Sequence, residues 1–345
     1  MSVVDADHAD AAVGLAAGLV ATAPSGCAVD AIVPSGATVP VAGIGDVRTL
    51  GMGRRELAAA WQLGIVPGVG GGLIHSPTLM APLVRHDRVH DNDQTTVTVW
   101  DLRAWEAPET LSKGSVAWQR GMLRRAVRHA DAVVVPSHAV AERLSEFAKI
   151  GDRLRVIAGA PPQGFRAPGD ASERRRALSL PDEYVVLTGS VSSLSDGFRG
   201  AVAAGLDAVV IDAPEGAEPR HADAAAAAGL PERRTHVRVA LSVEDRAAVL
   251  DGASAYVATD AVAGWPWRAV EAMVLGVPVV AVSSGSHRDV IADGGMLVPA
   301  EAIADAVAEA TGGAADRLRV LACDRSRAFS WASSAERLWG LHADL

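Results

Sequence analysis

The most constraining feature of this sequence is a series of short apolar runs, rich in β-branched residues, that alternate with alanine-rich stretches. In the first half these runs are "CAVDAIVPS", "GGLIHSP", "TTVTVWD", "DAVVVPS" and "RLRVIAGA"; in the second half they are "EYVVLTGS", "LDAVVIDAP", "THVRVAL", "SAYVATD", "VPVVAVSS" and "GMLVPA". Runs that are apolar throughout are typical of parallel strands covered by helices on both faces. The alternation of strand and helix predicts βαβ units and therefore a doubly wound α/β sheet.

Between the two series lies a segment without a strand pattern. It reads "APPQGFRAPGDASERRR" at residues 160–176 and is rich in proline, glycine and charge, which is typical of a connection between domains. A chain of 345 residues is also longer than a single core usually reaches. We therefore expect two Rossmann-like domains, at residues 1–165 and 166–328, followed by a terminal helix at residues 329–345. In such proteins the ligand cleft lies between the domains, at the carboxyl ends of the strands.

The composition limits the partners and the compartment. The formal net charge of −9 argues against a nucleic-acid-binding surface, which needs clustered cations. Cys27 and Cys323 are far apart in the sequence and have no metal-ligand spacing, which fits a reducing compartment. The first residues carry acids where a signal peptide is basic, and no apolar run reaches about 18 residues. We therefore expect a cytoplasmic protein.

One helix concentrates positive charge. The stretch "WQRGMLRRAVRHADA" at residues 118–132 contains Arg120, Arg124, Arg125 and Arg128. It can rest on an anionic membrane surface, or it can be a solvated helix face, which is the more common role of such a run. A peripheral contact with the inner face of the cell membrane thus stays open.

Two polar residues of the first half follow strands directly and are candidate catalytic residues. His75 ends the strand of "LIHSPTLMAPL", where it can hydrogen-bond a hydroxylated substrate near neutral pH or be a core histidine bonded to a backbone carbonyl. Asp101 follows the strand of "TVTVWDLRAWEAPETL". Its carboxylate can orient a substrate hydroxyl or cap the turn that follows.

The first strand of the second half leads into a candidate phosphate loop. In "VVLTGSVSSLSDGFRG", Gly189 and Ser190 follow the strand, and Arg199 is the only cation. Backbone amides in such a loop can cradle a phosphate, although loops of serine and glycine follow many strands that bind nothing.

Two further segments carry candidate donor-binding residues. In "AVAGWPWRAVEAM", at residues 261–273, Arg268 and Glu271 lie at the start of a helix, whose N-terminus attracts anions. Glu271 can accept hydrogen bonds from a ribose, or be only a favourable first-turn acid beside a solvated Arg268. In "SSGSHRDVIADGGMLVP", Ser286 and Asp289 can hold sugar hydroxyls, or Asp289 can begin a short helix. Metal-ligand spacing is missing, so we expect neither a metal nor another bound cofactor.

Together these segments resemble the GT-B-fold glycosyltransferases of family 4, also called glycosyl transferases group 1. "LIHSPTLMAPL" is similar to the family's His-x-Pro segment, whose histidine contacts the donor sugar, and the resemblance transfers that role to His75. "GWPWRAVEAMVLGVPVVAVSSGSHRDVIADGGMLVPA" is similar to the segment that binds the nucleotide sugar, and "RSRAFSWASSAERL" to the terminal helix that crosses back to the first domain. The resemblance implies a GT-B fold and metal-independent, retaining transfer of a hexose from a nucleoside-diphosphate sugar to a saccharide or lipid-linked hydroxyl acceptor. The pathways implied are polysaccharide and glycolipid biosynthesis.

The sequence departs from this family at the donor loop. The family has two glutamates separated by seven residues; the second is Glu271 here, but the first position is Ala263. The family's glycine-rich turn between them contains Pro266, which removes a backbone donor.

Other departures concern the phosphate cations and the first domain. Leu194 and Ser195 stand where the family has an arginine and a lysine, and Trp100 replaces the histidine of a His-Asp pair whose aspartate, Asp101, is kept. The family's first strand, with its Gly-Gly phosphate turn, is missing before the first helix. Arg199 and Arg268 are the candidates to replace the lost cations.

Two functions are compatible with these residues. The first is a divergent transferase in which Arg199 and Arg268 hold the diphosphate. The second is a non-catalytic GT-B protein that acts as a binding or scaffolding partner. His75, Asp101 and Glu271 favour the first function, whereas the substitutions at the donor site favour the second.

Overall fold

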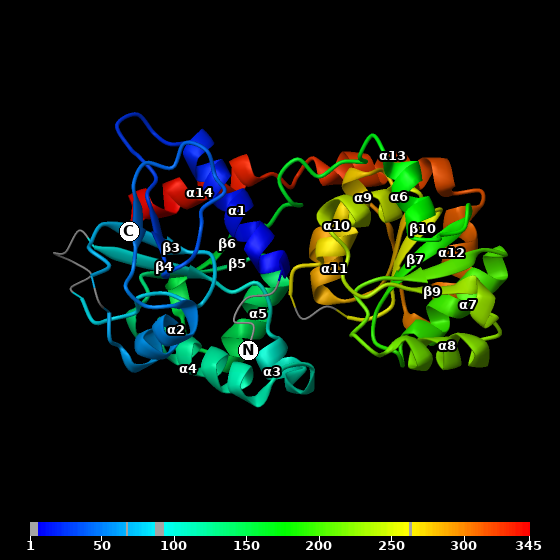
Figure 1. Ribbon diagram of the computed structural model, residues 1–345, viewed down its shortest axis with the longest axis horizontal. Helices are drawn as coiled ribbons and strands as arrows, with labels where there is room; N and C mark the ends of the chain where they lie inside the picture. Colours follow the sequence, from blue (N-terminus) through cyan, green and yellow to red (C-terminus); the bar gives the residue numbers. More distant parts are fainter. Residues whose placement is uncertain (1–5, 67, 87–92, 262–263) are drawn as a thin grey trace. The chain divides into compact units, whose positions relative to one another are not determined.

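The computed structural model describes residues 6–66, 68–86, 93–261 and 264–345, which form two compact units (Figure 1). Unit 1 contains the described residues up to Gln163 together with residues 264–265 and 329–345. Unit 2 contains the described part of residues 164–262 and residues 266–328. The chain thus passes from unit 1 to unit 2 after Gln163, near the predicted boundary at residue 165, and the terminal segment groups with unit 1.

Unit 1 contains six strands among its described residues, in two separate parallel sheets. A two-stranded sheet has the order β1-β2, and a four-stranded sheet has the order β3-β4-β5-β6. The strands are β1 (Ala31–Val33), β2 (Val47–Thr49), β3 (Leu73–Ser76), β4 (Gln94–Thr98), β5 (Ala132–Val135) and β6 (Leu154–Val156). The α-helices are α1 (Ala6–Ala21), α2 (Arg54–Leu63), α3 (Arg103–Glu106), α4 (Lys113–His129), α5 (His138–Phe147) and α14 (Trp331–Asp344). Short 3-10 turns at Pro108–Thr110 and Gly151–Arg153 join them.

Unit 2 is built on one six-stranded parallel sheet of order β12-β11-β10-β7-β8-β9. The strands are β7 (Tyr184–Thr188), β8 (Asp207–Val210), β9 (Thr235–Val237), β10 (Ala255–Ala258), β11 (Val279–Val282) and β12 (Met296–Val298). The α-helices are α6 (Ala171–Ala177), α7 (Leu194–Ala204), α8 (Glu218–Ala227), α9 (Val243–Asp251), α10 (Trp267–Val274), α11 (Gly285–Val290), α12 (Ile303–Thr311) and α13 (Ala315–Ser326). Helices α7, α8 and α12 cover one face of the sheet, and α9 and α10 cover the other (Figure 1).

The predicted fold class is confirmed, because both units have parallel sheets wound with helices. Each predicted apolar run contains a strand, and the buried central strands β5, β7 and β10 have the expected continuous apolar sequences. The strand β2 was not predicted, because its sequence, VRT, is short and fully exposed and lacks an apolar run. Unit 1 also differs from a single continuous sheet, since β1 and β2 do not pair with β3.

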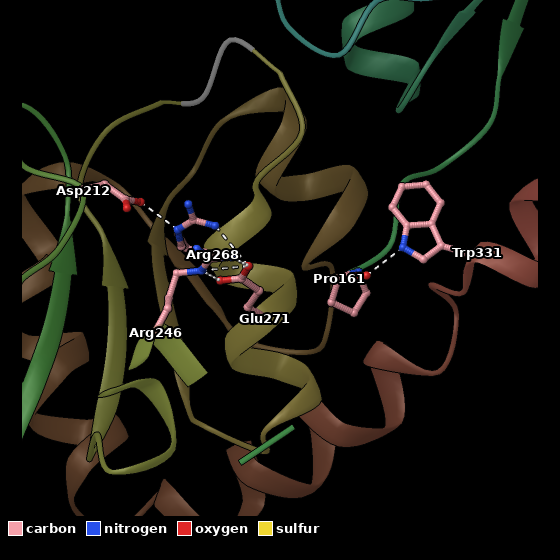
Figure 2. A network of polar contacts seen from close by, with 6 residues as sticks. All are labelled: Pro161, Asp212, Arg246, Arg268, Glu271 and Trp331. Carbon is pink, nitrogen blue, oxygen red and sulfur yellow. Dashed lines mark hydrogen bonds and ion pairs between the residues drawn. The ribbon is translucent and has the colours of Figure 1, made fainter. Parts of the chain in front are cut away.

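The terminal helix α14 packs against the first helix, α1, within unit 1. Trp331 begins α14, and its indole Nε1 donates a hydrogen bond to the Pro161 carbonyl at 2.7 Å (Figure 2). Two glycines of α1 make this packing possible. A Cβ atom built at Gly14 would lie 2.3 Å from the Trp331 Nε1, and one at Gly18 would lie 2.5 Å from the Trp331 carbonyl oxygen.

Histidine and threonine side chains form a polar cluster beneath these helices. The His75 Nδ1 lies 2.7 Å from the Thr96 Oγ1, and its Nε2 lies 3.2 Å from the Thr98 Oγ1. The His342 Nε2 of α14 lies 3.5 Å from the same Thr96 hydroxyl. Burial, and after it the charge of His342, lowers the pKa of His75 to about 3. The ring is therefore neutral in the folded protein at physiological pH.

We predict that Gly18→Ala destabilises the protein by about 1–3 kcal/mol, because the new methyl group meets backbone atoms of Trp331 that cannot easily move. The matched control is Gly340→Ala on α14, where an added Cβ meets nothing within 4 Å. This control should be neutral or stabilising by up to about 1 kcal/mol, as expected for alanine in a helix. Chemical denaturation measures both; equal effects would contradict the proposed close packing of α1 and α14.

We also predict that stability falls as the pH drops from 6.5 toward 3. His75 in the unfolded chain takes up a proton near pH 6.5, whereas in the folded protein it does so only near pH 3, so acid favours unfolding. In the wild type, protonation of the unfolded chain at His75 should lower the folding equilibrium constant about tenfold between pH 7 and pH 5. His75→Asn should remove this part of the decrease. His138→Asn, at an exposed position, is the control and should leave the pH dependence as in the wild type.

Candidate active site

The order of strands in unit 2 selects one place on the sheet for a ligand. From β7 the chain continues to β8 and β9 on one side, and then it returns to β10 on the other side of β7. In open α/β sheets, ligands bind beyond the carboxyl ends of the strands at such a reversal of strand order. The candidate site therefore lies where the loops that follow β7 and β10 meet.

The loop after β7 is tightly packed against residues that follow β10. Gly189 has a φ of 153°, and a Cβ atom there would lie 2.1 Å from the Thr259 Oγ1. Ser193, farther along the same loop, lies 2.9 Å from that hydroxyl through its Oγ. The position thus requires glycine for both its backbone conformation and its close contact with Thr259. The predicted residues Gly189 and Ser190 lie at the point of strand reversal.

A carboxylate of the chain itself accepts the hydrogen bond of a backbone amide in this loop. The Ser190 backbone N–H donates to the Asp260 Oδ2 at 2.5 Å, and the Ser190 Oγ donates to the Asp260 Oδ1 at 3.3 Å. Asp260 lies just after β10, so the parallel pairing of β7 and β10 places it opposite Ser190. Asp260 was not predicted as a site residue, although it follows the run "SAYVAT" just as Asp101 follows its own strand.

The start of α10 holds a network of four charged side chains (Figure 2). The Glu271 carboxylate is only 1% exposed and accepts hydrogen bonds from Arg246 of α9, at 2.9 Å from Nε and 2.8 Å from Nη2. The Glu271 carboxylate also accepts a hydrogen bond from the Arg268 Nη1 at 3.1 Å. The Arg268 Nε donates a second hydrogen bond, to the Asp212 Oδ2 at 2.7 Å. A buried carboxylate without partners would be very unfavourable, so the two guanidinium groups are what allow Glu271 to be buried.

Both predicted replacement cations are therefore in ion pairs. Arg268 is 11% exposed and contacts two carboxylates, those of Asp212 and Glu271. Arg199 is 53% exposed and pairs with Asp196 and Ser195 of its own helix, α7. The expectation of Arg268 as a solvated surface residue is thus wrong, because it is nearly buried. The two arginines of the network thus contact the carboxylates of Glu271 and Asp212, while Asp260 bonds to Ser190.

The substituted positions after β7 have clear structural roles. Leu194 begins α7 and is completely buried in the core of unit 2, so a cation at this position would enter an apolar environment. The hydroxyl of Ser195 accepts a hydrogen bond from Arg199 at 3.1 Å.

A tyrosine joins the two central strands at the same edge. The Tyr256 hydroxyl lies 2.7 Å from the Thr188 Oγ1 at the end of β7. Burial raises the pKa of Tyr256, and the Thr188 hydrogen bond and the Arg268 charge oppose this effect only in part. The phenol therefore remains neutral, and it helps to hold β10 beside β7.

The loop after β11 leads into α11, which carries the remaining predicted residues. Ser284 caps this helix by accepting a hydrogen bond from the His287 N–H at 3.2 Å, and Ser286 is buried. The His287 Nδ1 contacts the Val282 carbonyl at 2.7 Å, and burial lowers the pKa of the ring. Asp289 lies near the end of α11, so the alternative in which it begins a helix is wrong. Its backbone carbonyl accepts a hydrogen bond from Arg325 at 2.7 Å.

In unit 1, Asp101 is held by three donors. Its carboxylate accepts hydrogen bonds from the Arg103 backbone N–H at 2.9 Å and from the Arg103 Nη2 at 3.1 Å, and it lies 3.2 Å from the His8 Nε2. Burial alone would raise the pKa of Asp101, but the hydrogen bond with His8 and the charge of Arg103 hold it well below its ordinary value. The hydrogen bond from the Arg103 N–H is the turn cap that was one of the two alternatives for Asp101.

The residues just before α10 pack in unit 1. Gly264 forms an isolated bridge with Asp101, and a Cβ atom at Gly264 would lie 2.5 Å from the Trp100 carbonyl oxygen. The Trp265 backbone N–H donates to that oxygen at 3.1 Å. Trp100 is buried, and its indole Nε1 donates to the Pro77 carbonyl at 2.8 Å. Ala263, which replaces the first glutamate of the family, lies outside the described residues.

The predicted site residues thus form two groups. Gly189, Ser190, Arg268 and Glu271 lie at the carboxyl edge of the unit 2 sheet, where α11 also follows β11. His75 and Asp101 belong to unit 1, at and beyond the carboxyl ends of β3 and β4. Among the residues with described positions, no group of three histidines, cysteines or acids has the arrangement of a metal site. Likewise, no helix in this part of the chain is long and apolar enough to cross a membrane.

Comparisons with known proteins concern the fold and one segment of unit 2. Residues 208–313, which run from β8 to the end of α12, match the family model of glycosyl transferases group 1. No curated protein matches the chain. Among solved structures, Anabaena Alr3699/HepE in complex with UDP and glucose has a TM-score of 0.66 at 18% identity, covering 99% of this chain and 96% of that one. Sucrose-phosphate synthase from Thermosynechococcus elongatus has a TM-score of 0.64 at 20% identity, covering 96% and 91%. The chain therefore has the GT-B fold, and its residues 208–313 are similar to the family of glycosyl transferases group 1.

Proposed function

We propose that this protein is a retaining, metal-independent glycosyltransferase that moves a hexose from a nucleoside-diphosphate sugar to a hydroxyl acceptor in polysaccharide or glycolipid biosynthesis. The observation that carries the proposal is the convergence of Gly189, Ser190, Arg268 and Glu271 at the strand reversal of unit 2. Arg268 and Glu271 lie in the segment that matches the family model, whereas Gly189 and Ser190 precede it. Similar folds have been solved with UDP-glucose or with UDP and glucose, which supports a UDP-sugar as the donor.

In this proposal, the diphosphate binds at the Ser190 amide, and Arg268 turns from Asp212 toward it. Transfer passes through a loose, oxocarbenium-like transition state in which negative charge grows on the leaving diphosphate. Donors that are already fixed in position stabilise this charge most effectively. Glu271 stays bonded to Arg246 and accepts a hydrogen bond from the ribose in place of the one from Arg268.

The other predicted residues have proposed roles within their own units. Ser286 and Asp289 contribute to binding the donor sugar, and Arg199 is a further cation available to the phosphates if it leaves Asp196. His75 and Asp101 contact the sugar and the acceptor in unit 1. For His75 this requires one of its two threonine hydrogen bonds to be exchanged for a substrate hydroxyl.

One observation favours a second function, that of a non-catalytic binding or scaffolding protein. Asp260 already satisfies the Ser190 amide, and its negative charge opposes a diphosphate at the same place. If Asp260 cannot be displaced, the fold keeps the architecture of a transferase without its donor.

We also propose a cytoplasmic location, with peripheral contact to an anionic membrane through α4. Arg124 and Arg128 of this helix are exposed, as this contact requires. Arg120 and Arg125 instead donate to the carbonyls of Ala104 and Leu83 within unit 1.

Asp260→Ser should bind UDP and UDP-glucose at least about tenfold more tightly than the wild type, because it removes a like charge and releases the Ser190 amide. Isothermal titration calorimetry measures the affinities. Asp223→Ser, which removes the same charge from an exposed position on α8, is the control and should leave them unchanged. Dissociation constants above about 1 mM for both the wild type and Asp260→Ser would contradict the transferase and favour the scaffold.

Arg246→Leu should destabilise the protein by about 3–5 kcal/mol, because it removes the closest partner of a buried carboxylate. The double variant Arg246→Leu with Glu271→Leu should recover most of this loss, since no charge then lacks its partner.

Glu271→Gln in the wild-type background tests the ribose contact: UDP should bind more weakly while the uridine-free ligand pyrophosphate binds as before. Unchanged UDP affinity would limit Glu271 to a structural role.

A further inference from the structure

Unit 1 contains a cavity of about 340 Å³ between its two sheets. One wall comes from β1, including Ile32, and the opposite wall from Leu73 and His75 of β3. Helices α1 and α14 close a third side through residues such as Leu15, Ala16 and Leu338. We call this cavity the strand slot, for the reason that follows.

Both strands that flank the slot turn a hydrogen-bonding edge toward it. In the pair β1-β2, Ala31 and Val33 bond to β2, which leaves the N–H and C=O of Ile32 on the opposite edge. In the pair β3-β4, the Gly72 carbonyl accepts from Gln94, so the alternate residues Leu73 and His75 direct their backbone groups away from β4. Within the described parts of the chain, no backbone partner is present for these three residues on the slot side.

The side chains around the slot define the chemistry of its occupant. The described lining is almost entirely apolar, and the two histidines in it, His75 and His342, have pKa values lowered chiefly by burial. Asp30, which precedes β1, is the one carboxylate in that lining. The slot thus favours a mainly apolar segment with a basic residue at one end.

We propose that the strand slot binds a short extended segment of another polypeptide, which pairs with Ile32 on one side and with Leu73 and His75 on the other. This inserted strand would join the two sheets of unit 1 into one continuous sheet. It is strand addition of the kind that extended peptides make at exposed sheet edges, except that two edges pair at once. The lengths of β1 and β3 set the paired part at three to four residues.

A peptide fits the slot better than a lipid chain of similar shape. An aliphatic chain would satisfy the apolar walls, but it would cover the backbone groups of Ile32, Leu73 and His75 and leave them without hydrogen bonds. Each buried backbone group without a partner is strongly unfavourable. A peptide supplies donors and acceptors at the spacing of both edges and still presents apolar side chains to α1 and α14.

The test uses the full chain and a fluorescein-labelled peptide of alternating valine and threonine with a lysine at each end. Fluorescence anisotropy should show binding with a dissociation constant below about 1 mM. Hydrogen exchange should slow at the amides of Ile32, Leu73 and His75, while Ala31 and Val33, already paired with β2, change little. The same peptide with N-methylated backbone amides should bind at least about tenfold more weakly, because it cannot donate to the edges.

A matched pair of variants locates the binding site. Ala16→Trp fills the slot and should weaken binding at least about tenfold, whereas Ala17→Trp, on the adjacent position of α1 outside the described lining, should leave it unchanged. Equal binding of the N-methylated peptide, or equal effects of the two variants, would overturn the proposal. So would binding of palmitate that is blocked by Ala16→Trp while the peptide does not bind, since the slot would then hold an acyl chain. A dimer of the chain alone that Ala16→Trp abolishes would make a second copy the occupant.

Discussion

The carboxyl edge of the unit 2 sheet is organised by the burial of one carboxylate. Glu271 is 1% exposed, and an ionised group at such a position is stable only when opposite charges and hydrogen bonds replace the water that it has lost. Arg246 supplies two of these bonds from α9, and Arg268 supplies another from one helical turn earlier in α10. The packing of α9 against α10 and the direction in which Arg268 points both follow from this requirement.

This requirement also sets the charge that a ligand would meet. Arg268 donates hydrogen bonds to both Glu271 and Asp212, and the Asp260 carboxylate accepts a hydrogen bond from the Ser190 amide of the neighbouring loop. Unit 2 contains no lysine, since both lysines of the chain, Lys113 and Lys149, are in unit 1. Its positive charge therefore comes from arginines, whose forked geometry suits carboxylates and phosphates equally well. Binding of a diphosphate at this edge is for that reason a competition between phosphate and carboxylate for the same guanidinium.

Much of the fold could be predicted because parallel strands leave a strong local signal. Runs such as "EYVVLTGS" and "SAYVATD" are apolar on both faces, and each contains a central strand of the sheet. The positions of Arg268 and Glu271 near the start of α10 could be read from the same pattern. Strand β2 could not be predicted, because its three residues are exposed and their sequence resembles that of a loop.

The partners of the site residues were harder to predict, since they depend on contacts between distant segments. Arg246 precedes Glu271 by 25 positions and has the appearance of a solvated helix residue; only the packing of α9 on α10 buries it. Asp260 and Ser190 are separated by 70 positions and meet because β7 pairs with β10. The hydroxyls of Thr96 and Thr98, which hold His75, come from the adjacent strand β4 in the same way. Local sequence gave the candidate residues, but tertiary pairing determines which of their hydrogen bonds are already made.

The contact between Asp260 and Ser190 has a consequence for the entropy of ligand binding. Loops that recognise phosphate often become ordered only when the ligand arrives, and that ordering weakens the affinity. Here the loop after β7 is already closed around a carboxylate, with Gly189 fixed against Thr259. An anion that binds here would displace Asp260 from the Ser190 N–H without reordering the backbone of the loop. Its affinity would therefore depend on how much more strongly it binds this amide than the Asp260 carboxylate does, and not on the entropy of ordering the loop.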